Sequence, residues 1–356
     1  MIHPLSRRGF VVAAAAGLAA PAIARGAAPF RLRCSLDTAP VHARNVAIGD
    51  YLHRLETASD GRIRTELFHA GALAADAAVP QALAQGQVEM ACPGSWVLTG
   101  AVADCDVVNL PVLYSQPIEL CRRVLDGKTG AHINAQLRRA LRARVLGPWL
   151  HLGFQHWYSA TRPIAALADL KGLTIRNGGG AATAWRTRFF NAVPTTTPWP
   201  EVTPALSQGR FEGLITTNES AFSARLWEAG VKTTIQDRQS VDNYVPLVSE
   251  AFFDALPWDL QALLITTWQQ NVGGYRAAML DAQDLALEGL RAHGVVDTTP
   301  PDEEIAALRE AMLAEQHRLV KEWRLSAELP GLLTEDIGQR SAVPVPSRAA
   351  LARQSG

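Results

Sequence analysis

The sequence predicts an α/β protein of two domains. Strand and helix patterns alternate from residue 30 onward, as in a parallel sheet that helices cover on both faces. The length of 356 residues suits two domains of roughly 150 residues each. A run of helix formers from Trp258 to about His293 predicts a helix longer than 30 residues. Thirty residues already span ~45 Å at about 1.5 Å per residue. That length suits a helix lying across both domains better than a piece of one core.

Hydrophobic periodicity predicts the elements of the first half. Residues 30–36 alternate with a period of two, which indicates a strand. Residues 43–58 predict an amphipathic helix with Val46, Leu52 and Leu55 on one face. Further strands are expected at 63–68 and 88–92, with a helix between them at 76–86.

A second unit begins near residue 150. Its strands are expected at 150–159, 173–176, 214–217 and 244–249, and its helices at 181–191, 201–209 and 302–325. Gly273 and Gly274 lie inside the long helix, where they could bend it. We expect domain I to hold residues 28–150 plus about 244–275, domain II to hold 151–243 plus about 276–340, and residues 341–356 to form a tail.

The N-terminus has the pattern of an export signal. A twin-arginine motif, S-R-R-G-F-V at residues 6–11, precedes an apolar run that ends near Ala20. Small residues follow, and cleavage is expected after Ala24, with Gly26 or Ala27 as alternatives. The apolar run is shorter than the ~20 residues of a membrane span, so a retained anchor is the less favoured reading. Residues 1–27 are thus predicted to be a signal peptide, and the mature protein to be soluble in the periplasm.

Composition argues against several classes of partner. Acidic and basic side chains balance at 34 each, so no bulk field attracts nucleic acid or an anionic membrane. The four cysteines allow three full pairings, of which Cys105 with Cys121 closes the easiest loop. Cys34 and Cys92 are expected to be buried small hydrophobes. No C-x-x-C pair is present, which argues against a zinc ribbon.

Three motifs that suggest a cofactor or a metal are incomplete. Gly127-Lys128-Thr129 lacks the first glycine of a phosphate-binding loop. The glycines at 178–180 lead into a helix, but Thr183 breaks the dinucleotide-binding spacing. His151 and His156 have no metal-ligand spacing. We therefore expect neither a cofactor nor a metal.

One position combines the features of an anion site. Arg176 ends a predicted strand, and a glycine-rich turn and a helix follow it. A helix N-terminus presents unpaired N–H groups and partial positive charge, and a guanidinium matches the two oxygens of a carboxylate. A ligand carboxylate is therefore one reading of this site, and a salt bridge from Arg176 to a nearby acid is the other.

The order and spacing of several motifs resemble one family. Residues 169–176, D-L-K-G-L-T-I-R, are similar to a D-L-K-G-L-K-I-R stretch in the DctP-type substrate-binding proteins of TRAP transporters, the tripartite ATP-independent periplasmic carriers. The family patterns are also matched, in order, at residues 70–73, 85–90, 110–114, 125–130, 194–213 and 253–257. The resemblance covers about residues 36–260 and implies a periplasmic-binding-protein fold with a central cleft, crossing strands and a long interdomain helix.

The resemblance also implies a receptor that binds a small organic anion and delivers it to TRAP membrane subunits, without catalysis. Arg176 would clamp a ligand carboxylate. Gln155 stands 21 positions earlier, where many members carry a second arginine, so a monocarboxylate, a keto acid or an anion with a neutral polar end all remain open. His156 could restore a positive charge there at low pH. The further expected ligand contacts are Asn218, Trp199, Ser95, Trp96 and His42.

Two alternative interpretations give the protein a function outside such a transporter. A periplasmic sensor, or an orphan receptor that serves another system, would have the same fold. An exported enzyme would need an acid or base, for which His156, Glu201 and Glu219 are the candidates. No convergent catalytic motif supports the enzyme.

Overall fold

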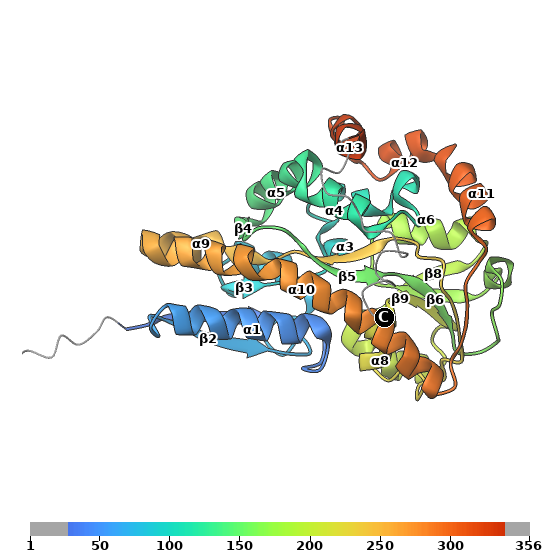
Figure 1. Ribbon diagram of the computed structural model, residues 1–356, viewed down its shortest axis with the longest axis horizontal. Coiled ribbons are helices and arrows are strands. Elements are labelled where there is room, and N and C mark those ends of the chain that lie inside the picture. Colours follow the sequence, from blue (N-terminus) through green and yellow to red (C-terminus); the bar gives the residue numbers. More distant parts are fainter. Residues whose placement is uncertain (1–27, 339–356) are drawn as a thin grey trace, which may run out of the picture.

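Two mixed sheets form the centre of the molecule (Figure 1). The computed structural model describes residues 28–338, so the expected signal peptide and the expected tail at 341–356 lie outside the described residues. The first sheet has the order β2-β1-β3-β12-β4 and the second β13-β10-β6-β9-β7-β8. The first sheet comprises β1 (Phe30–Ser35), β2 (Ile63–Phe68), β3 (Met90–Ala91), β4 (Ala143–Val145) and β12 (Leu247–Ser249). The second comprises β6 (His156–Ser159), β7 (Thr174–Asn177), β8 (Val193–Thr196), β9 (Gly213–Thr216), β10 (Thr233–Ile235) and β13 (Val296–Thr298).

The chain crosses between the two sheets on two antiparallel strands. β5 (Leu150–Phe154) leads from the first sheet to the second, and β11 (Val241–Tyr244) leads back beside it. Each crossing delivers the next strand against the direction of its neighbours, so β12 is antiparallel to β3 and β6 is antiparallel to β9. The expected purely parallel sheet is therefore wrong, although β1 with β2 and β7 with β8 are parallel as predicted.

The long helix α10 (Trp258–Ala292) is confirmed and lies across both halves of the molecule. It contacts α1 (Ala43–Ala58), β5 and α8 (Asn218–Ser223), and runs through Gly273 and Gly274 without interruption. Its first half packs into the core of the first sheet through Leu264 and Trp268. Leu290, near its end, packs with the second sheet. Helix α10 is therefore anchored in the cores of both sheets.

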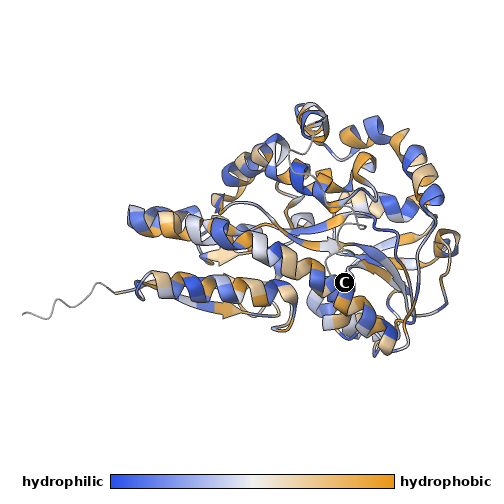
Figure 2. Ribbon diagram, in the orientation of Figure 1, coloured by the Kyte–Doolittle hydropathy of each residue, from blue (hydrophilic) through white to orange (hydrophobic). Residues whose placement is uncertain are grey.

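Helix α1 shows where periodicity gave the wrong face. Leu52 and Leu55 are buried as predicted, but Val46 is 61% exposed. The buried stripe consists of Ile48, Tyr51, Leu52 and Leu55, which follow helical spacing, and Val46 lies outside it. Figure 2 shows this alternation of hydrophobic and hydrophilic residues along α1 and α10.

The C-terminal helices pack on the first half of the chain. The predicted helix at 302–325 is divided into α11 (Asp302–Leu313) and α12 (Gln316–Glu322). α11 contacts η3 (Pro111–Leu113), and α13 (Leu329–Gly338) contacts α4 (Ile118–Asp126) and α5 (Lys128–Leu141). The exact domain limits stay a prediction. The remaining helices are η1 (Asp76–Ala78), α2 (Val79–Ala84), α3 (Ser95–Leu98), η2 (Ala103–Asn109), η4 (Leu167–Leu170), α6 (Ala181–Phe189), η5 (Trp199–Glu201), α7 (Val202–Ser207) and α9 (Glu250–Ala255).

All four cysteines are buried and free, so none of the possible pairings, including the easily closed loop between Cys105 and Cys121, is formed among them. Cys105 lies in the large core cluster, whereas Cys121 packs separately with Ile118 and Val241. Cys34 and Cys92 are buried among hydrophobic side chains, as predicted. Burial raises the pKa of Cys92 and of Cys121 to about 12, which keeps these thiols unreactive.

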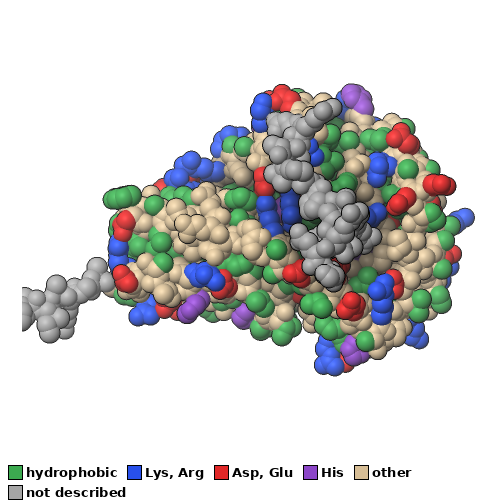
Figure 3. Space-filling view, in the orientation of Figure 1, with side chains coloured by type: hydrophobic (Ala, Val, Ile, Leu, Met, Phe, Trp, Pro, Cys, Tyr) green, Lys and Arg blue, Asp and Glu red, His purple; other side chains and the backbone are tan. Residues whose placement is uncertain are grey.

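The surface carries both charges in mixture. Figure 3 shows Lys and Arg side chains interspersed with Asp and Glu over one face of the molecule. No helix within residues 28–338 has the length and the hydropathy that a membrane crossing requires.

Candidate functional site

A cavity of about 290 Å³ lies between the two sheets. The loops at the carboxyl ends of β1 and β3, with η1, form its first wall, and the ends of β7, β8 and β9 form its second wall. The first wall consists of Asp37, Thr38, Asp76, Ala77, Trp96 and Val97. The second wall consists of Arg176, Gly178, Gly179, Thr183, Thr196, Pro198, Trp199, Ile215, Thr216 and Ser220. Gln155, Asp242 and Tyr244 come from the crossing strands.

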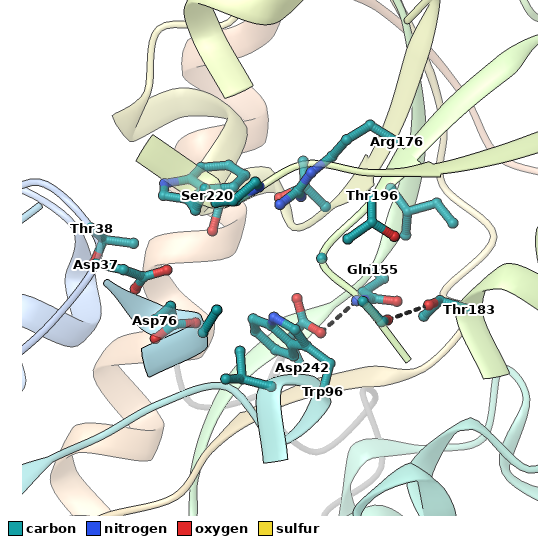
Figure 4. A pocket seen from close by; sticks show the side chains of 18 of the residues that line it. Asp37, Thr38, Asp76, Trp96, Gln155, Arg176, Thr183, Thr196, Ser220 and Asp242 are labelled. Atoms are coloured by element: carbon teal, nitrogen blue, oxygen red, sulfur yellow. Dashed lines mark hydrogen bonds between the residues drawn. The ribbon is translucent and has the colours of Figure 1, made fainter. Parts of the chain in front are cut away.

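Arg176 is a buried cation that is oriented by the backbone. Its side chain is 4% exposed, and its Nε and Nη2 atoms donate to the carbonyl oxygen of Thr197 at 2.9 and 2.5 Å. Its guanidinium lies 5.5 Å from the centre of the Trp199 ring. Among the ion pairs of residues 28–338, none involves Arg176, so the alternative of an internal salt bridge has no support. Figure 4 shows the guanidinium pointing into the cavity.

The charge of Arg176 is only partly balanced by its surroundings. Burial lowers its pKa to about 10, and the acids Asp37, Asp242 and Asp76 oppose that shift. The guanidinium therefore stays cationic at neutral pH. Its Nη1 atom makes no hydrogen bond with residues 28–338 and is available to an anion.

The helix end that was expected to share the anion is already occupied. Asp106, from η2, accepts hydrogen bonds from the backbone N–H groups of Ala181 and Ala182 at the start of α6. Burial raises the pKa of Asp106 to about 6, although these bonds oppose the rise. A carboxylate of the same chain therefore occupies these two N–H groups, and ligand binding by the α6 N-terminus stays a prediction.

The triple glycine before α6 permits a close approach by the first wall. A Cβ atom on Gly178 would lie 2.7 Å from Nε1 of Trp96, which is too close for any side chain. Gly180 has a φ of +88° and faces the Asp106 carboxylate. The glycines thus serve packing between the walls and not a nucleotide.

Four of the expected site residues line the cavity: Arg176, Gln155, Trp96 and Trp199. Nε2 of Gln155 donates to Oδ1 of Asp242 at 2.6 Å, and Oε1 accepts from Oγ of Ser240 at 3.2 Å. Trp96 packs edge-on against Tyr244, with ring centres 5.6 Å apart. Whether these side chains touch a ligand remains a prediction, since their placement alone supports it.

The other three expected residues do not line the cavity. Asn218 starts α8, but its side chain turns to Tyr158 and to Gln236, whose Oε1 accepts from Nδ2 of Asn218 at 3.0 Å. Ser95 is buried beside Trp96, which takes the lining position. His42 caps α1, and its Nε2 lies 3.1 Å from Oγ of Ser220. Sequence position placed these residues near the cleft, but the direction of each side chain decides which of them enters the cavity.

The candidates for acid–base chemistry lie elsewhere. Burial lowers the pKa of His156 to about 3, so this histidine is neutral and cannot supply the positive charge suggested for low pH. Glu201 is exposed, 3.8 Å from Arg210. Glu219 is buried against His42 and the backbone N–H of Ala43. None of the three lines the cavity.

Three acids of the cavity were missed by the sequence analysis. Asp37 forms a buried ion pair with Arg44. Burial and the neighbouring Asp37 carboxyl raise the pKa of Asp76 well above its usual range. Burial raises the pKa of Asp242 to about 7. Asp37 follows β1 directly, so the rule on strand ends that selected Arg176 could have found it. Within residues 28–338, no three His, Cys, Asp or Glu side chains are grouped to hold a metal ion.

A comparison with models of protein families identifies the family of this chain. The family model described as bacterial extracellular solute-binding protein, family 7 (DctP), matches residues 42–322. The chain belongs to this family. It therefore shares the two-domain fold of TRAP solute receptors, which confirms the fold and the family that the motifs at 169–176 and elsewhere resemble.

Individual relatives agree with the family match. A solute-binding protein of Verminephrobacter eiseniae is 27% identical over 80% of this chain and 84% of its own length. The 2,3-diketo-L-gulonate-binding periplasmic protein YiaO of Escherichia coli is 24% identical over 81% of this chain and 86% of its own. The crystal structure of the sugar acid binding protein DctPAm of Advenella mimigardefordensis, in complex with galactonate, superposes with a TM-score of 0.80. At 19% identity it covers 87% of this chain and 98% of its own, which shows the shared fold.

Proposed function

We propose that this protein is the extracytoplasmic receptor of a TRAP transporter and binds a small organic anion through its carboxylate. The observation that carries the proposal is Arg176, a buried cation without an ion-pair partner among residues 28–338 whose guanidinium faces a cavity between two domains. A protein retains an unpaired buried charge at the expense of stability, and such groups cluster at functional sites. A ligand carboxylate would supply the missing counter-charge.

The size of the cavity and the energetics fit capture of a small molecule. A volume of about 290 Å³ is at the small end of ligand pockets. A micromolar Kd requires about −8 kcal/mol, and hydrogen bonds to a charged group contribute roughly 1.5–3 kcal/mol each. The guanidinium, the polar groups of the walls and the packing of Trp96 and Trp199 together reach that range.

Capture would proceed by closure of two domains about the crossing strands. β5, β11 and α10 join the domains, and each wall of the cavity belongs to a different sheet. Closure buries the ligand away from water, where the ion pair with Arg176 is stronger. The bound, closed form would then be the one that the membrane subunits of the transporter recognise.

Export and the absence of catalysis complete the proposal. The twin-arginine pattern at residues 6–11 supports export to the periplasm, where YiaO is also placed by its name. The family consists of receptors, and His156, Glu201 and Glu219 lie outside the cavity. We therefore propose a receptor that performs no chemistry on its ligand. The ligands in the names of its relatives, 2,3-diketo-L-gulonate and galactonate, are both organic acids.

A screen with matched variants tests the proposal. Organic acids that raise the melting temperature would be titrated calorimetrically against the wild type, Arg176→Lys, Arg176→Gln and the surface control Arg210→Gln, whose side chain is 57% exposed. We expect Arg176→Gln to weaken binding by about 2–5 kcal/mol. Lysine should restore only part of this loss, because it lacks the planar fork. Unchanged affinity in both Arg176 variants would refute the clamp.

A further inference from the structure

A further buried arginine lies behind the cavity. Arg186, on α6, is 0% exposed, and none of the ion pairs within residues 28–338 involves it. Burial lowers its pKa, and the more distant Tyr114, Asp237 and Asp106 oppose that shift. Its side chain is not part of the cavity lining, so it does not act as a second clamp. A buried cation without an ion-pair partner requires another explanation.

Arg186 is held between two segments of the chain. Its Nη2 donates to the carbonyl oxygen of Asn109, at the end of η2, at 2.7 Å. Its Nη1 donates to Oδ1 of Asn109 and to Oγ of Ser240, both at 3.3 Å. Ser240 directly precedes β11. Since a guanidinium carries donors and no acceptor, the Ser240 oxygen must accept from Arg186.

Hydrogen bonds continue from Ser240 to the cavity. Oγ of Ser240 donates to Oε1 of Gln155 at 3.2 Å, and Nε2 of Gln155 donates to Oδ1 of Asp242 at 2.6 Å. Figure 4 shows the last of these bonds, between two residues of the cavity lining. Arg186, Ser240, Gln155 and Asp242 therefore form one hydrogen-bond chain. Every bond in it has the same direction, from the cation to the carboxyl group.

The backbone leaves the Gln155 amide free to turn over. The N–H of Gln155 donates to the carbonyl oxygen of Ser240 at 2.8 Å, which fixes the two residues side by side. The oxygen and nitrogen of an amide are nearly equal in size, so both orientations fit the same space. In the reversed orientation the Ser240 oxygen would face two donors, from Arg186 and from Gln155, and its own proton would lose the acceptor on Gln155. Arg186 thus disfavours the reversed amide.

Asp242 alone does not fix the amide. An ionised carboxylate can only accept and holds the amide nitrogen, whereas a protonated carboxyl can also donate to the oxygen of a reversed amide. Burial raises the pKa of Asp242 to about 7, although the bond from Gln155 and the charge of Arg176 oppose the rise. Both forms of Asp242 are therefore present at neutral pH. The orientation of the amide then depends on the other end of the chain, at Arg186.

We propose that Arg186 is a positioning residue of the cavity, which acts through Ser240 to hold the amide nitrogen of Gln155 toward Asp242. The donated bond favours the ionised form of Asp242, because a hydrogen bond to the charged form stabilises that form. The importance of this arrangement for a ligand rests on the proposed function. The hydrogen-bond chain itself requires no ligand and is tested without one, so the two proposals can fail separately.

The proton affinity of Asp242 in the ligand-free protein measures the effect. Aspartate labelled with ¹³C at the carboxyl carbon allows each group to be titrated by NMR, and Asp242→Asn assigns the signal. Ser240→Ala removes the hydroxyl and leaves both bonds from Arg186 to Asn109. We expect it to lower the ionisation constant of Asp242 about threefold or more, a rise of about half a unit in its pKa.

The other charged groups near Asp242 are unchanged in this variant. Arg176 on β7 and Tyr244 on β11 interact with it, and Asp37 and Asp76 line the same cavity.

Ser115→Ala is the matched control. It removes another buried hydroxyl, which has no hydrogen-bond partner in the part of the chain that the structure describes. It should leave the pKa of Asp242 at its wild-type value. A wild-type pKa in Ser240→Ala, or an equal shift in both serine variants, would refute the proposal.

A double-mutant cycle assigns the effect to Arg186. Arg186→Gln keeps amide donors for Asn109 but adds an acceptor, so it no longer requires Ser240 to accept. We expect it to raise the pKa of Asp242 in the wild-type background and to have no further effect in Ser240→Ala. An equal shift in both backgrounds would show that the charge acts directly through space, which contradicts a role through Ser240. If Arg186→Gln does not fold, the comparison of Ser240→Ala with Ser115→Ala decides.

Discussion

Two buried arginines near the cavity show how a structural charge differs from a functional one. Arg44, behind the first wall, is 0% exposed, and Arg176, in the second wall, is 4% exposed. Arg44 has Asp37 as an ion-pair partner and stacks 4.1 Å from the centre of the Tyr244 ring. Within residues 28–338, Arg176 has no ion-pair partner; its guanidinium donates to the carbonyl oxygen of Thr197 and lies 5.5 Å from the centre of the Trp199 ring. Both side chains are therefore almost completely buried, and the presence of an ion-pair partner for Arg44 distinguishes it from Arg176.

The pKa values express the same difference. Burial lowers the pKa of Arg44, but Asp37 more than offsets this effect, and the pKa is raised overall. Burial also lowers the pKa of Arg176, and its more distant acids do not offset it, so the pKa falls to about 10. Folding removes the Arg176 guanidinium from water without giving it an ion-pair partner among the described residues. The carboxylate of a ligand can therefore neutralise this charge.

The largest expected effect is on stability and comes from Arg44. Replacing Arg44 by methionine leaves Asp37 as an uncompensated buried charge, so we expect a loss of about 3–5 kcal/mol in the free energy of unfolding. Arg176→Met should not destabilise the ligand-free protein, because it removes an unpaired charge and leaves no acid without its ion-pair partner. Urea unfolding of both ligand-free variants measures the difference.

The control for this pair lies on the same helix as Arg44. Arg54 pairs with Asp50 on the surface of α1, and Arg54→Met should leave the urea midpoint almost unchanged. If Arg176→Met proves as destabilising as Arg44→Met, Arg176 is a structural residue and the comparison fails.

Local patterns made part of this site predictable. Arg176 could be found because a strand end, a glycine turn and a helix follow one another within a few residues. Helix α10 was predictable because a continuous run of helix formers fixes its length, whichever elements it packs against. Trp199 could be found because it falls within the family pattern at 194–213, and Trp96 because it follows the third predicted strand.

Contacts distant in sequence made the rest unpredictable. Asp37 and Asp76 meet only because β1 and η1 fold onto one wall, and no local pattern links them. The direction of β6 and β12 depends on the crossing strands, whose pairing joins residues about 90 positions apart, such as Leu150 and Tyr244. Asn218 does not line the cavity, because its side chain is hydrogen-bonded to Gln236, 18 positions further along the chain.

The next largest effect is on the pH dependence of stability and comes from Asp242, whose hydrogen-bond partner Gln155 is neutral. Folding raises the pKa of Asp242 from its usual 3.8 to about 7, because the site is buried. Between about pH 4 and 7 the unfolded chain has released this proton and the folded chain retains it, so stability falls as pH rises. We expect Asp242→Asn to reduce that fall by up to about 1 kcal/mol per pH unit in the ligand-free protein. Melting temperatures across this range measure the slope, and parallel curves for wild type and variant would contradict the assignment.

The smallest effect concerns a contact that joins the two walls. Glu219, in α8, accepts from the backbone N–H of Ala43 at 2.8 Å through Oε1, and its Oε2 lies 2.9 Å from Nε2 of His42. This carboxylate lies at the positive N-terminus of α1, so under the proposed closure it would link the two domains. We expect Glu219→Gln to weaken ligand binding about three- to tenfold, because the closed form loses a favourable charge while the acceptor oxygen remains.

A variant on the same domain separates closure from a general effect of charge. Glu228→Gln removes an equal charge from a side chain that is 52% exposed and pairs only with Arg225. Calorimetry should find its affinity equal to that of the wild type. Glu219 lines no part of the cavity, so a loss confined to Glu219→Gln must act through the closed arrangement of the walls. Equal losses in both variants would show instead that affinity follows the net charge of the domain, and the contact between His42 and Glu219 would then have no part in holding the ligand.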